Sequence, residues 1–539
     1  MAQTGKNGAY IRLRGQEMQR LTGLDATFLY LDNAHNHMHV ASTAVFDPST
    51  VPGGYSFEGV RKLVSERLPL LPPFRRRLVE VPFGIHHPIW IEDPSFDLDY
   101  HLRRAALPAP GGPRELAEFA EEAFGRPLDR SRPLWEMFVV EGLENGLIAT
   151  VTKTHHSAID GVSGAELTVN LLDLQPEPMP MTEPDRWKPD RVPTDLEMIA
   201  YALLSLSRQP VAALKSARRT TEMALTLRRR NRQPGTTPPP APFSAPRTSL
   251  NTTITPHRRF AFTQVSLDDV KAVKNALGGT VNDVVLALCA GALRSYFEKR
   301  GEAIDKDLVA MVPVSVRTED QKGTMGNQVA SMLVSLATTI DDPVERLAAI
   351  IEGTQSAKQQ EQAIGAKDLM NWTEFAAPAL AARAARLYSN MRLADRHNPF
   401  FNVTISNVPG PDFPLYSAGA RMVSMYPMGP ITDGGALNMT VMSYMGGMNF
   451  GLVGCRERVS NIWDLVAGLE ESLQALKKAA ERATAPPAVR ARKRVPATAE
   501  PRASSQEAAP AAVVAGAVAG PLATSSDVRE EAATPASSG

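Results

Sequence analysis

Hydrophobic positions along the chain recur with the spacing of amphipathic helices. The first clear run is Phe57, Val60, Leu63, Val64 and Leu68. Residues three or four positions apart share one face of a helix, so this run predicts a helix, which we expect to end at Pro72-Pro73. The same spacing predicts further helices over residues 116–124, 195–232, 284–296, 343–362, 372–393 and 462–476.

Short β-rich runs separate these helices. The predicted strands cover residues 35–46, 137–140, 147–154, 259–265, 308–316, 332–336, 401–406, 421–426, 437–444 and 448–454, with the last three completing one sheet. From Leu24 the alternation of Phe28 and Tyr30, and later of Met38, Val40 and Ser42, predicts that the chain enters its first sheet around residues 35–46. Glu144-Asn145-Gly146 predicts a β-hairpin, and residues 407–411 predict a turn that breaks the strand before them.

One stretch places ionisable side chains where a predicted strand ends. It reads HHSAIDG, from His155 to Gly161, and a helix capped by Ser163 is expected to follow. Histidine titrates nearest neutrality, so it can take a proton from an alcohol or thiol and return it. Asp160 lies four residues after His156, which in a helical turn puts both on one face. Glycine at position 161 permits a backbone angle or close approach that a larger residue would block.

Three simpler interpretations of the histidine pair compete with catalysis. The first is a buried polar cluster whose hydrogen bonds are satisfied within the protein. The second is a metal site, but zinc needs three or four ligands and no cysteine or further histidine lies near in sequence. The third is chance, because His86-His87 is a second doublet without an aspartate or glycine at the matching positions. A histidine pair alone is therefore weak evidence.

The complete heptad is more specific. HHSAIDG resembles the HHxxxDG signature of the CoA-dependent acyltransferase superfamily typified by chloramphenicol acetyltransferase. Further motifs resemble the bacterial wax ester synthase/acyl-CoA:diacylglycerol acyltransferase family, and the resemblance runs from about Leu21 to about Ala480. These motifs are LTGLDATFLYLD from Leu21, Pro133-Leu134-Trp135, Asn282-Asp283, PVSVR ending at Arg317, Gly326-Asn327 and SNVPGP from Ser406.

The resemblance implies an α/β (α+β) fold in which two chloramphenicol-acetyltransferase-like halves form a pseudo-dimer around a central channel. The expected organisation is a disordered N-terminus (1–20), an N-terminal half with HHxxxDG (21–180), a helical insert and flexible Pro-rich linker (181–257), a C-terminal half (258–480) and a disordered tail (481–539). Trp135 is expected to be a core residue.

The resemblance also assigns roles to residues. It implies that His156 is the general base, that His155 supports its loop, and that Asp160 pairs with Arg317 across the two halves. Such a pair would keep the aspartate ionised and clamp the loop next to Gly161. Asn282 and Asp283 belong to a motif near the channel, although Thr280 and Asp283 also fit a helix capping box, which is a sufficient structural reason for Asp283.

The implied reaction esterifies diacylglycerol to triacylglycerol with acyl-CoA as co-substrate, and long-chain alcohols to wax esters as an overlapping activity. No bound cofactor and no metal are expected. Two alternatives stay open: a condensation-like acyltransferase that uses carrier-protein thioesters, and a non-catalytic lipid-surface binding protein.

Composition and charge narrow the remaining choices. Lys+Arg and Asp+Glu both total 58 in 539 residues, so nothing global indicates nucleic acid. Cys289 and Cys455 lie in apolar patterns and are predicted to be buried thiols of a cytoplasmic protein. No apolar run reaches about 18 residues, so we expect no spanning helix, while a peripheral place on the inner membrane face or on lipid droplets is open.

Three local features have two interpretations each. The basic helix 195–232 fits a membrane surface or a solvated interdomain helix equally. Arg75-Arg76-Arg77 is typical of a solvated edge, with cofactor phosphates as the alternative. His37 and His39 face the same side of a predicted strand, which favours a sheet-surface or core pair, and the resemblance puts them near the channel.

Overall fold

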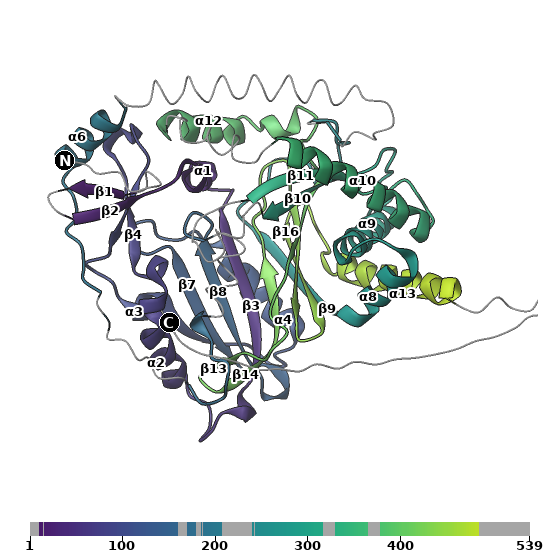
Figure 1. Cartoon of the computed structure of the whole chain (residues 1–539), viewed down its shortest axis with the longest axis horizontal. Coiled ribbons are helices and arrows are strands. Elements are labelled where there is room, and N and C mark those ends of the chain that lie inside the picture. The colour runs from purple at the N-terminus through teal and green to yellow at the C-terminus, as the bar shows by residue number, and fades with distance from the viewer. Residues whose placement is uncertain are drawn as a thin grey trace, which may run out of the picture. The chain divides into compact units, whose positions relative to one another are not determined.

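The computed structural model describes residues 10–13, 16–159, 170–178, 185, 187–206, 240–241, 243–315, 329–364 and 378–484. Several predicted features lie outside these residues: most of the helix of residues 195–232, the Ser163 cap, the Gly326-Asn327 motif and almost all of the C-terminal tail. Residues 10–484 belong to one compact unit. Figure 1 shows its helices and strands in the order of the chain.

Within the described residues, the first large sheet has six strands, most of them from the N-terminal half. Its order is β13 (Tyr416–Ser417), β14 (Ala420–Met428), β3 (His39–Asp47), β8 (Ile148–His155), β7 (Trp135–Glu141) and β6 (Leu102–Ala106). Only β6 and β7 pair in parallel. The hairpin between β7 and β8 turns at Glu144–Gly146, where Asn145 and Gly146 have positive φ angles, as the Asn-Gly pair predicted.

The second six-stranded sheet comes from the C-terminal half. Its order is β11 (Val329–Ser335), β10 (Val309–Ser315), β12 (Val403–Val408), β15 (Leu437–Tyr444), β16 (Gly447–Cys455) and β9 (Arg258–Ser266). A smaller four-stranded sheet has the order β1 (Tyr10–Leu13), β2 (Gln16–Arg20), β5 (Ile89–Glu92) and β4 (Arg76–Val79). The mixed sheets and their helices confirm the predicted α/β class.

Ten helices accompany these sheets among the described residues, and most of them bury an apolar face in the protein. They are α1 (Gly23–Leu31), α2 (Phe57–Arg67), α3 (Leu98–His101), α4 (Pro113–Gly125), α6 (Asp195–Leu206), α8 (Leu267–Leu277), α9 (Val281–Lys299), α10 (Pro343–Ile364), α12 (Pro378–Asn390) and α13 (Trp463–Thr484). Among the described residues no single helix is long and apolar enough to cross a membrane. Helices α8 and α9 together have sufficient length and apolar composition, but the angle between them is 101°.

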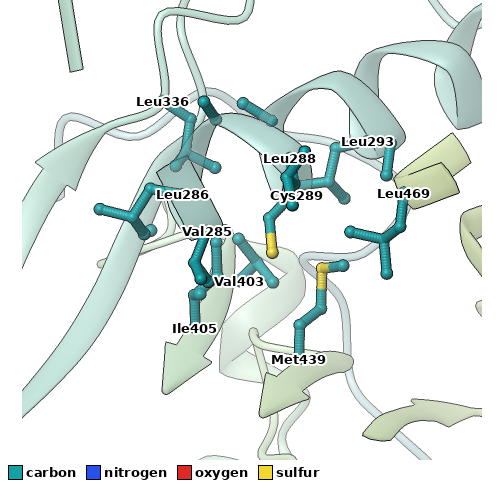
Figure 2. Close-up of a cluster of buried hydrophobic side chains, with 14 of the residues drawn as sticks. Val285, Leu286, Leu288, Cys289, Leu293, Leu336, Val403, Ile405, Met439 and Leu469 are labelled. Atoms are coloured by element: carbon teal, nitrogen blue, oxygen red, sulfur yellow. The ribbon is translucent and has the colours of Figure 1, made fainter. Parts of the chain in front are cut away.

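Helix α9 is the centre of the largest hydrophobic core. Cys289 on α9 lies among the side chains of Leu288, Met439 and Leu469, so strands of the second sheet and α13 enclose the helix (Figure 2). Burial raises the pKa of the Cys289 thiol well above its usual value. Cys455 is also free and buried, which confirms the prediction for both cysteines.

Two of the contacts that join the halves involve strands of the large sheets. The first is β14, which leaves the second half of the sequence and pairs antiparallel with β3 of the first sheet, with a bulge between Met422 and Ser424. The prediction that this strand belongs to the sheet of β15 and β16 is therefore wrong. Where β14 crosses β16, a Cβ on Gly451 would lie 1.8 Å from the carbonyl oxygen of Pro427, so only glycine permits this approach.

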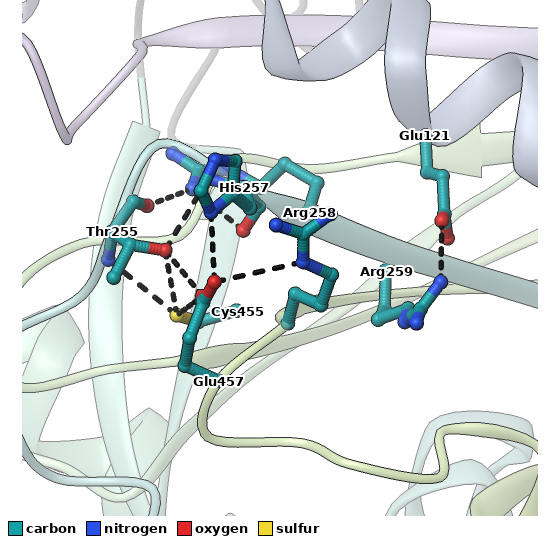
Figure 3. Close-up of polar contacts among 8 residues, drawn as sticks. Glu121, Thr255, His257, Arg258, Arg259, Cys455 and Glu457 are labelled. Carbon is teal, nitrogen blue, oxygen red and sulfur yellow. Dashed lines mark hydrogen bonds and ion pairs between the residues drawn. The ribbon is translucent and has the colours of Figure 1, made fainter.

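The second link is between α4 and β9. Glu121 on α4 accepts a hydrogen bond from Arg259 at 2.8 Å (Figure 3). It accepts another from the Phe260 N–H at 2.9 Å. At the start of β9, His257 pairs with Glu457 at 2.7 Å in a polar cluster that includes Thr255 and Cys455 (Figure 3). The edge of the second sheet is therefore bound directly to a helix of the first half.

The structure corrects three local predictions about helices and strands. Phe28 and Tyr30 belong to helix α1 and not to a strand, because Thr22 caps a helical turn by accepting from the Asp25 N–H. Helix α2 ends at Arg67, before the prolines, and short 3-10 turns cover Pro72-Pro73. Strand β12 continues to Val408.

Two further corrections concern polar segments. Residues 243–256, predicted to be part of a flexible linker, are packed: Leu250 is buried, and buried Asn251 donates to the Gly434 carbonyl at 2.8 Å. The arginine run is neither a solvated edge nor a free anion site, because Arg75 pairs with Asp185, Arg76 with Glu92 and Arg77 with Asp93.

Candidate active site

The two histidines of the heptad are fixed at the end of β8 by neighbouring strands. The His155 N–H donates to the Leu134 carbonyl at 2.9 Å, and the His156 N–H donates to the Met38 carbonyl at 2.8 Å. His155 is the last residue of the strand, and His156 begins the turn that follows. Because successive strand residues point to opposite faces, the two rings enter different environments.

The His156 ring lies at the wall of a cavity of about 570 Å³. It is partly exposed and stacks on Phe28 of α1, with ring centroids 4.0 Å apart and an interplanar angle of 12°. This volume is typical of ligand cavities. His156 is therefore placed where a bound molecule can reach it.

Both halves of the chain line this cavity, and most of the lining is apolar. The first half contributes side chains such as Val40, Phe46, Leu63 and Phe74, and the second contributes Met311, Phe401, Val408, Met425 and Met442. A few hydroxyl and amide groups, including Thr154 and Asn438, interrupt this surface. An apolar cavity of this kind suits a hydrocarbon chain, and the methionines can adapt to its shape.

His155 has no part in the cavity lining and is almost fully buried behind His156. Its Nδ1 accepts from the Ser157 N–H at 3.1 Å, which leaves the proton of the neutral ring on Nε2. Nε2 lies 3.5 Å from Oδ2 of Asp32. Burial lowers the pKa of His155, although Asp32 opposes this, so the ring is neutral.

Asp32 is held in turn by Arg130, whose guanidinium lies 2.9 Å from Oδ2. Burial alone would raise the pKa of Asp32, but His155 and Arg130 outweigh it and the pKa is lowered. A charged arginine and an ionised aspartate thus fix the orientation of His155 and, through the shared turn, of His156.

His37 and His39 extend this buried group and are a core pair. The His37 and His39 rings stack with centroids 5.5 Å apart, and His39 meets His155 edge-on at 5.8 Å. Burial lowers the pKa of His37 to about 4 and that of His39 well below its usual value. Neither ring lines the cavity, so these histidines support the wall behind the site.

The second doublet, His86-His87, is a satisfied polar pair away from the cavity. His86 Nε2 lies 2.8 Å from the Ser205 hydroxyl, and His87 Nδ1 lies 2.6 Å from the Tyr30 hydroxyl. Among the described residues no group of three or more His, Cys, Asp or Glu side chains could hold a metal ion.

The other predicted site residues divide into two groups. Asp160, Gly161 and Arg317 lie outside the described residues, so the Asp160–Arg317 pair stays a prediction. Asp283 is described and is structural: its Oδ2 accepts from the Thr280 N–H at 2.8 Å, which confirms the capping box.

The Thr354 hydroxyl donates to the other Asp283 oxygen at 2.6 Å. Neither Asn282 nor Asp283 lines the cavity, so the structure gives no support to a substrate contact by either residue. Trp135 is a core residue as predicted, and its indole N–H donates to the Phe74 carbonyl at 2.8 Å.

Sequence reasoning missed Phe28, Asp32 and Arg130. Phe28 and Asp32 are both inside the LTGLDATFLYLD motif from Leu21, so the motif marked the right segment without its roles. Arg130 carries no local signal, because its contact with Asp32 joins positions far apart in sequence.

The chain is similar to known acyltransferases over most of its length. Residues 21–285 match the model of the wax ester synthase/diacylglycerol acyltransferase catalytic domain, and residues 325–477 match that of the WS/DGAT C-terminal domain. A putative diacylglycerol O-acyltransferase of Mycobacterium tuberculosis is 39% identical over 463 residues, covering 85% of this chain and 90% of that protein. A probable diacylglycerol O-acyltransferase of the same organism is 38% identical, covering 84% and 98%.

Two solved structures have a fold similar to that of this chain. The wax ester synthase/diacylglycerol acyltransferase from Marinobacter aquaeolei VT8 is 33% identical with a TM-score of 0.61, covering 86% of this chain and 100% of that chain. The starter condensation domain of rhizomide synthetase is 14% identical with a TM-score of 0.52, covering 87% and 96%, and shares the fold.

Proposed function

The chain belongs to the wax ester synthase/diacylglycerol acyltransferase family, and we propose that it transfers a fatty acyl group from coenzyme A to the hydroxyl group of diacylglycerol. Long-chain alcohols are overlapping acceptors in this proposal and give wax esters. The observation that carries it is the position of the partly exposed His156 ring at the wall of an apolar cavity built by both halves.

In the proposed reaction His156 is the general base. It takes the proton of the acceptor hydroxyl while the oxygen attacks the thioester carbonyl carbon, which forms the new C–O bond. The tetrahedral intermediate then collapses, the C–S bond breaks, and the imidazolium returns the proton to the thiolate of coenzyme A. Because a thiol has a pKa near 8.5, the thiolate leaves without a strong acid. No covalent acyl-enzyme is part of this route.

Several contacts support the role of His156. Phe28 restrains the ring by stacking, and the backbone bond to Met38 fixes its Cα. His155, oriented by Asp32, supports the turn from behind. The proposal retains the ion pair between Asp160 and Arg317 as the clamp on the loop, since a charged pair of this kind would hold the turn next to Gly161.

The apolar lining supports a long acyl chain as the group transferred. Each buried methylene contributes about 0.8 kcal/mol, so a long chain gains much of its binding free energy from such a cavity. Diacylglycerol and the product partition into lipid, so the proposal includes a cytoplasmic enzyme that works peripherally at a lipid surface.

The test uses the purified full-length protein with labelled palmitoyl-CoA and either diacylglycerol or hexadecanol. His156→Ala should lower the rate roughly 10²–10⁴-fold with either acceptor and leave the fold intact. His257→Ala is the matched control, because this half-exposed histidine lies outside the cavity and pairs with Glu457. It should keep the rate of the unmodified protein.

Three outcomes would contradict the proposal. Turnover that survives His156→Ala would show that His156 is not the general base. Turnover with palmitoyl-carrier protein and none with palmitoyl-CoA would favour the condensation-like reaction. Absence of any ester product from the unmodified protein, together with lipid binding, would favour a non-catalytic lipid-surface protein.

A further inference from the structure

Helix α12 presents an apolar stripe to the outside of the protein. Leu380 is 69% exposed, Leu387 is 56% exposed, and Met391, in the turn that follows, is 44% exposed. Ala384 is exposed between them. With 3.6 residues per turn these four positions fall within about 60° of one another, so they form one continuous face. Large apolar side chains are usually buried, and a gathered exposed face needs a partner.

Arginines accompany this stripe. Arg383 and Arg386 are exposed on one flank of α12, and Arg392 and Arg396 are exposed just beyond its end. The helix itself contains no aspartate or glutamate. Within the described part of the chain, none of these four arginines forms an ion pair with an acidic side chain. The face therefore combines apolar contact area with positive charge that is not neutralised nearby.

The other side of α12 packs against the part of the protein that carries the active-site wall. It contacts α1 and the turn Pro82–Gly84, and Ser389 on this side is buried. In that turn Phe83 has a φ of 62° and is 84% exposed, an arrangement that is strained for a bulky residue and adds an aromatic side chain beside α12. In Figure 1, α12 lies directly above α1.

Helix α1 connects this surface to the cavity. Phe28 stacks on His156, and Leu31 both lines the cavity and is 41% exposed. Helix α1, which packs against α12, therefore reaches from the cavity wall to the outside of the protein at Leu31.

We propose that α12 is the helix that lies in the interface of a phospholipid surface with anionic headgroups and holds the α1 side of the cavity next to that surface. Helices with an apolar face and a basic flank bind in this plane, with the apolar side chains in the acyl boundary and the arginines at the headgroups. Each arginine near an anionic surface strengthens attachment several-fold. The idea that the acyl acceptor comes from this lipid surface rests on the proposed function. The binding of α12 to the surface does not depend on that function.

The sequence predicted a possible membrane-surface helix in another segment. Residues 195–232 have a basic amphipathic pattern, but the described part, α6, contains no lysine or arginine. The lysines and arginines of that segment, from Arg208 on, lie outside the described residues, whereas in α12 the basic and apolar groups are described on one helix.

The test measures co-flotation of the full-length protein with vesicles of phosphatidylcholine containing 30% phosphatidylglycerol, and with vesicles of phosphatidylcholine alone. The unmodified protein should bind the anionic vesicles more tightly, and added salt should weaken this preference. Leu380→Glu/Leu387→Glu should reduce binding at least about tenfold, because it puts charge into the acyl boundary. Arg383→Gln/Arg386→Gln should reduce the preference for anionic vesicles by roughly tenfold or more.

The matched control is Leu174→Glu/Val423→Glu, which changes two residues that are exposed but lie outside α12. It should bind as the unmodified protein does. Esterification of a short, water-soluble alcohol with octanoyl-CoA measures the active site independently of any surface, and all variants should keep it. A protein without this activity that still shows the full binding series would contradict the proposed function and leave the surface assignment standing.

Binding by both α12 variants at the unmodified level would overturn the assignment. A lower melting temperature of Leu380→Glu/Leu387→Glu with unchanged vesicle binding would mean that another part of the protein covers the stripe, which also overturns it. If the leucine variant does not fold, the arginine variant decides, since Arg383 and Arg386 are exposed and unpaired among the described residues.

Discussion

The aromatic ring of Phe28 lies parallel to the imidazole of His156, with 4.0 Å between ring centroids and 12° between planes. The contact joins the first helix of the described chain to the turn after β8, and it fixes the face that His156 can present to a substrate. An aromatic face also stabilises the imidazolium that forms when the base takes a proton.

Phe28→Ala should therefore lower kcat by roughly 2- to 30-fold, as the loss of about 0.5–2 kcal/mol implies. Steady-state kinetics with palmitoyl-CoA measure it. Phe119→Ala is the control, because Phe119 packs on Phe138 outside the cavity. An unchanged kcat in Phe28→Ala would mean that the stacking on His156 contributes to packing and not to catalysis.

Asp283 should matter for stability and not for turnover. Asp283→Ala removes the side-chain half of the α9 capping box and the bond to Thr354, so the free energy of unfolding should fall by about 1–2 kcal/mol. The rate per folded molecule should stay the same. Chemical denaturation and kcat are measured on one preparation, and a lower kcat at normal stability would restore the substrate-positioning role.

Asn251 tests whether residues 243–256 are structural. Its side-chain amide donates to the carbonyls of Phe401, Asn402 and Gly434, and its oxygen accepts from Asn402. Asn251→Ala leaves these buried groups unpaired and should lower the free energy of unfolding by about 2–3 kcal/mol. Asn390→Ala changes an exposed amide and is the control. Equal stability of the two variants would mean that residues 243–256 act as a linker and do not stabilise the fold.

The crossing of β14 over β16 depends on Gly451. Gly451→Ala would force a methyl group into the Pro427 carbonyl and should cost more than about 3 kcal/mol, because backbone cannot move aside as a side chain can. Gly353→Ala in α10 meets no atom within 4 Å and should be neutral or stabilising by up to about 1 kcal/mol. Melting temperatures of both variants test the contrast, which an undisturbed Gly451→Ala protein would contradict.

Stability should fall on acidification from pH 6.5 to 4. Burial lowers the pKa of His37 and of His86 to about 4, whereas an unfolded histidine titrates near 6.5. Between these values the unfolded chain binds protons that the folded chain does not, so each histidine contributes a loss of up to about 1.4 kcal/mol per pH unit. Denaturant unfolding across this range measures the slope. His86→Gln should make it shallower, and an unchanged slope would contradict the assignment.

Local patterns predicted most helices and strands because each depends on residues close in sequence. The hairpin at Asn145 and the cap at Thr280 are of this kind, and both are confirmed. Helix α1 was missed because two aromatic residues two positions apart imitate a strand. The partner of β14 could not be predicted locally, because the pairing with β3 joins positions nearly 400 residues apart in the chain and the strand has the same alternation on either sheet.

For the active site, the sequence predicted the position of His156 but not the contacts that support it. The heptad and its resemblance placed His156 beside a channel, and the cavity between the halves agrees with that expectation. The supporting contacts could not be predicted, because the distance from Asp32 to Arg130 and to His155 depends on how α1 packs on the end of β8. Motifs identify which residues matter, and tertiary packing decides what each one touches.

The pairing of β14 with β3 has a consequence for synthesis on the ribosome. Strand β3 is complete at residue 47, but its outer neighbour ends at residue 428, so one edge stays unpaired for roughly half a minute of translation. An open edge can pair with the wrong chain, and nascent copies of this protein should accordingly depend on chaperones until the C-terminal half emerges.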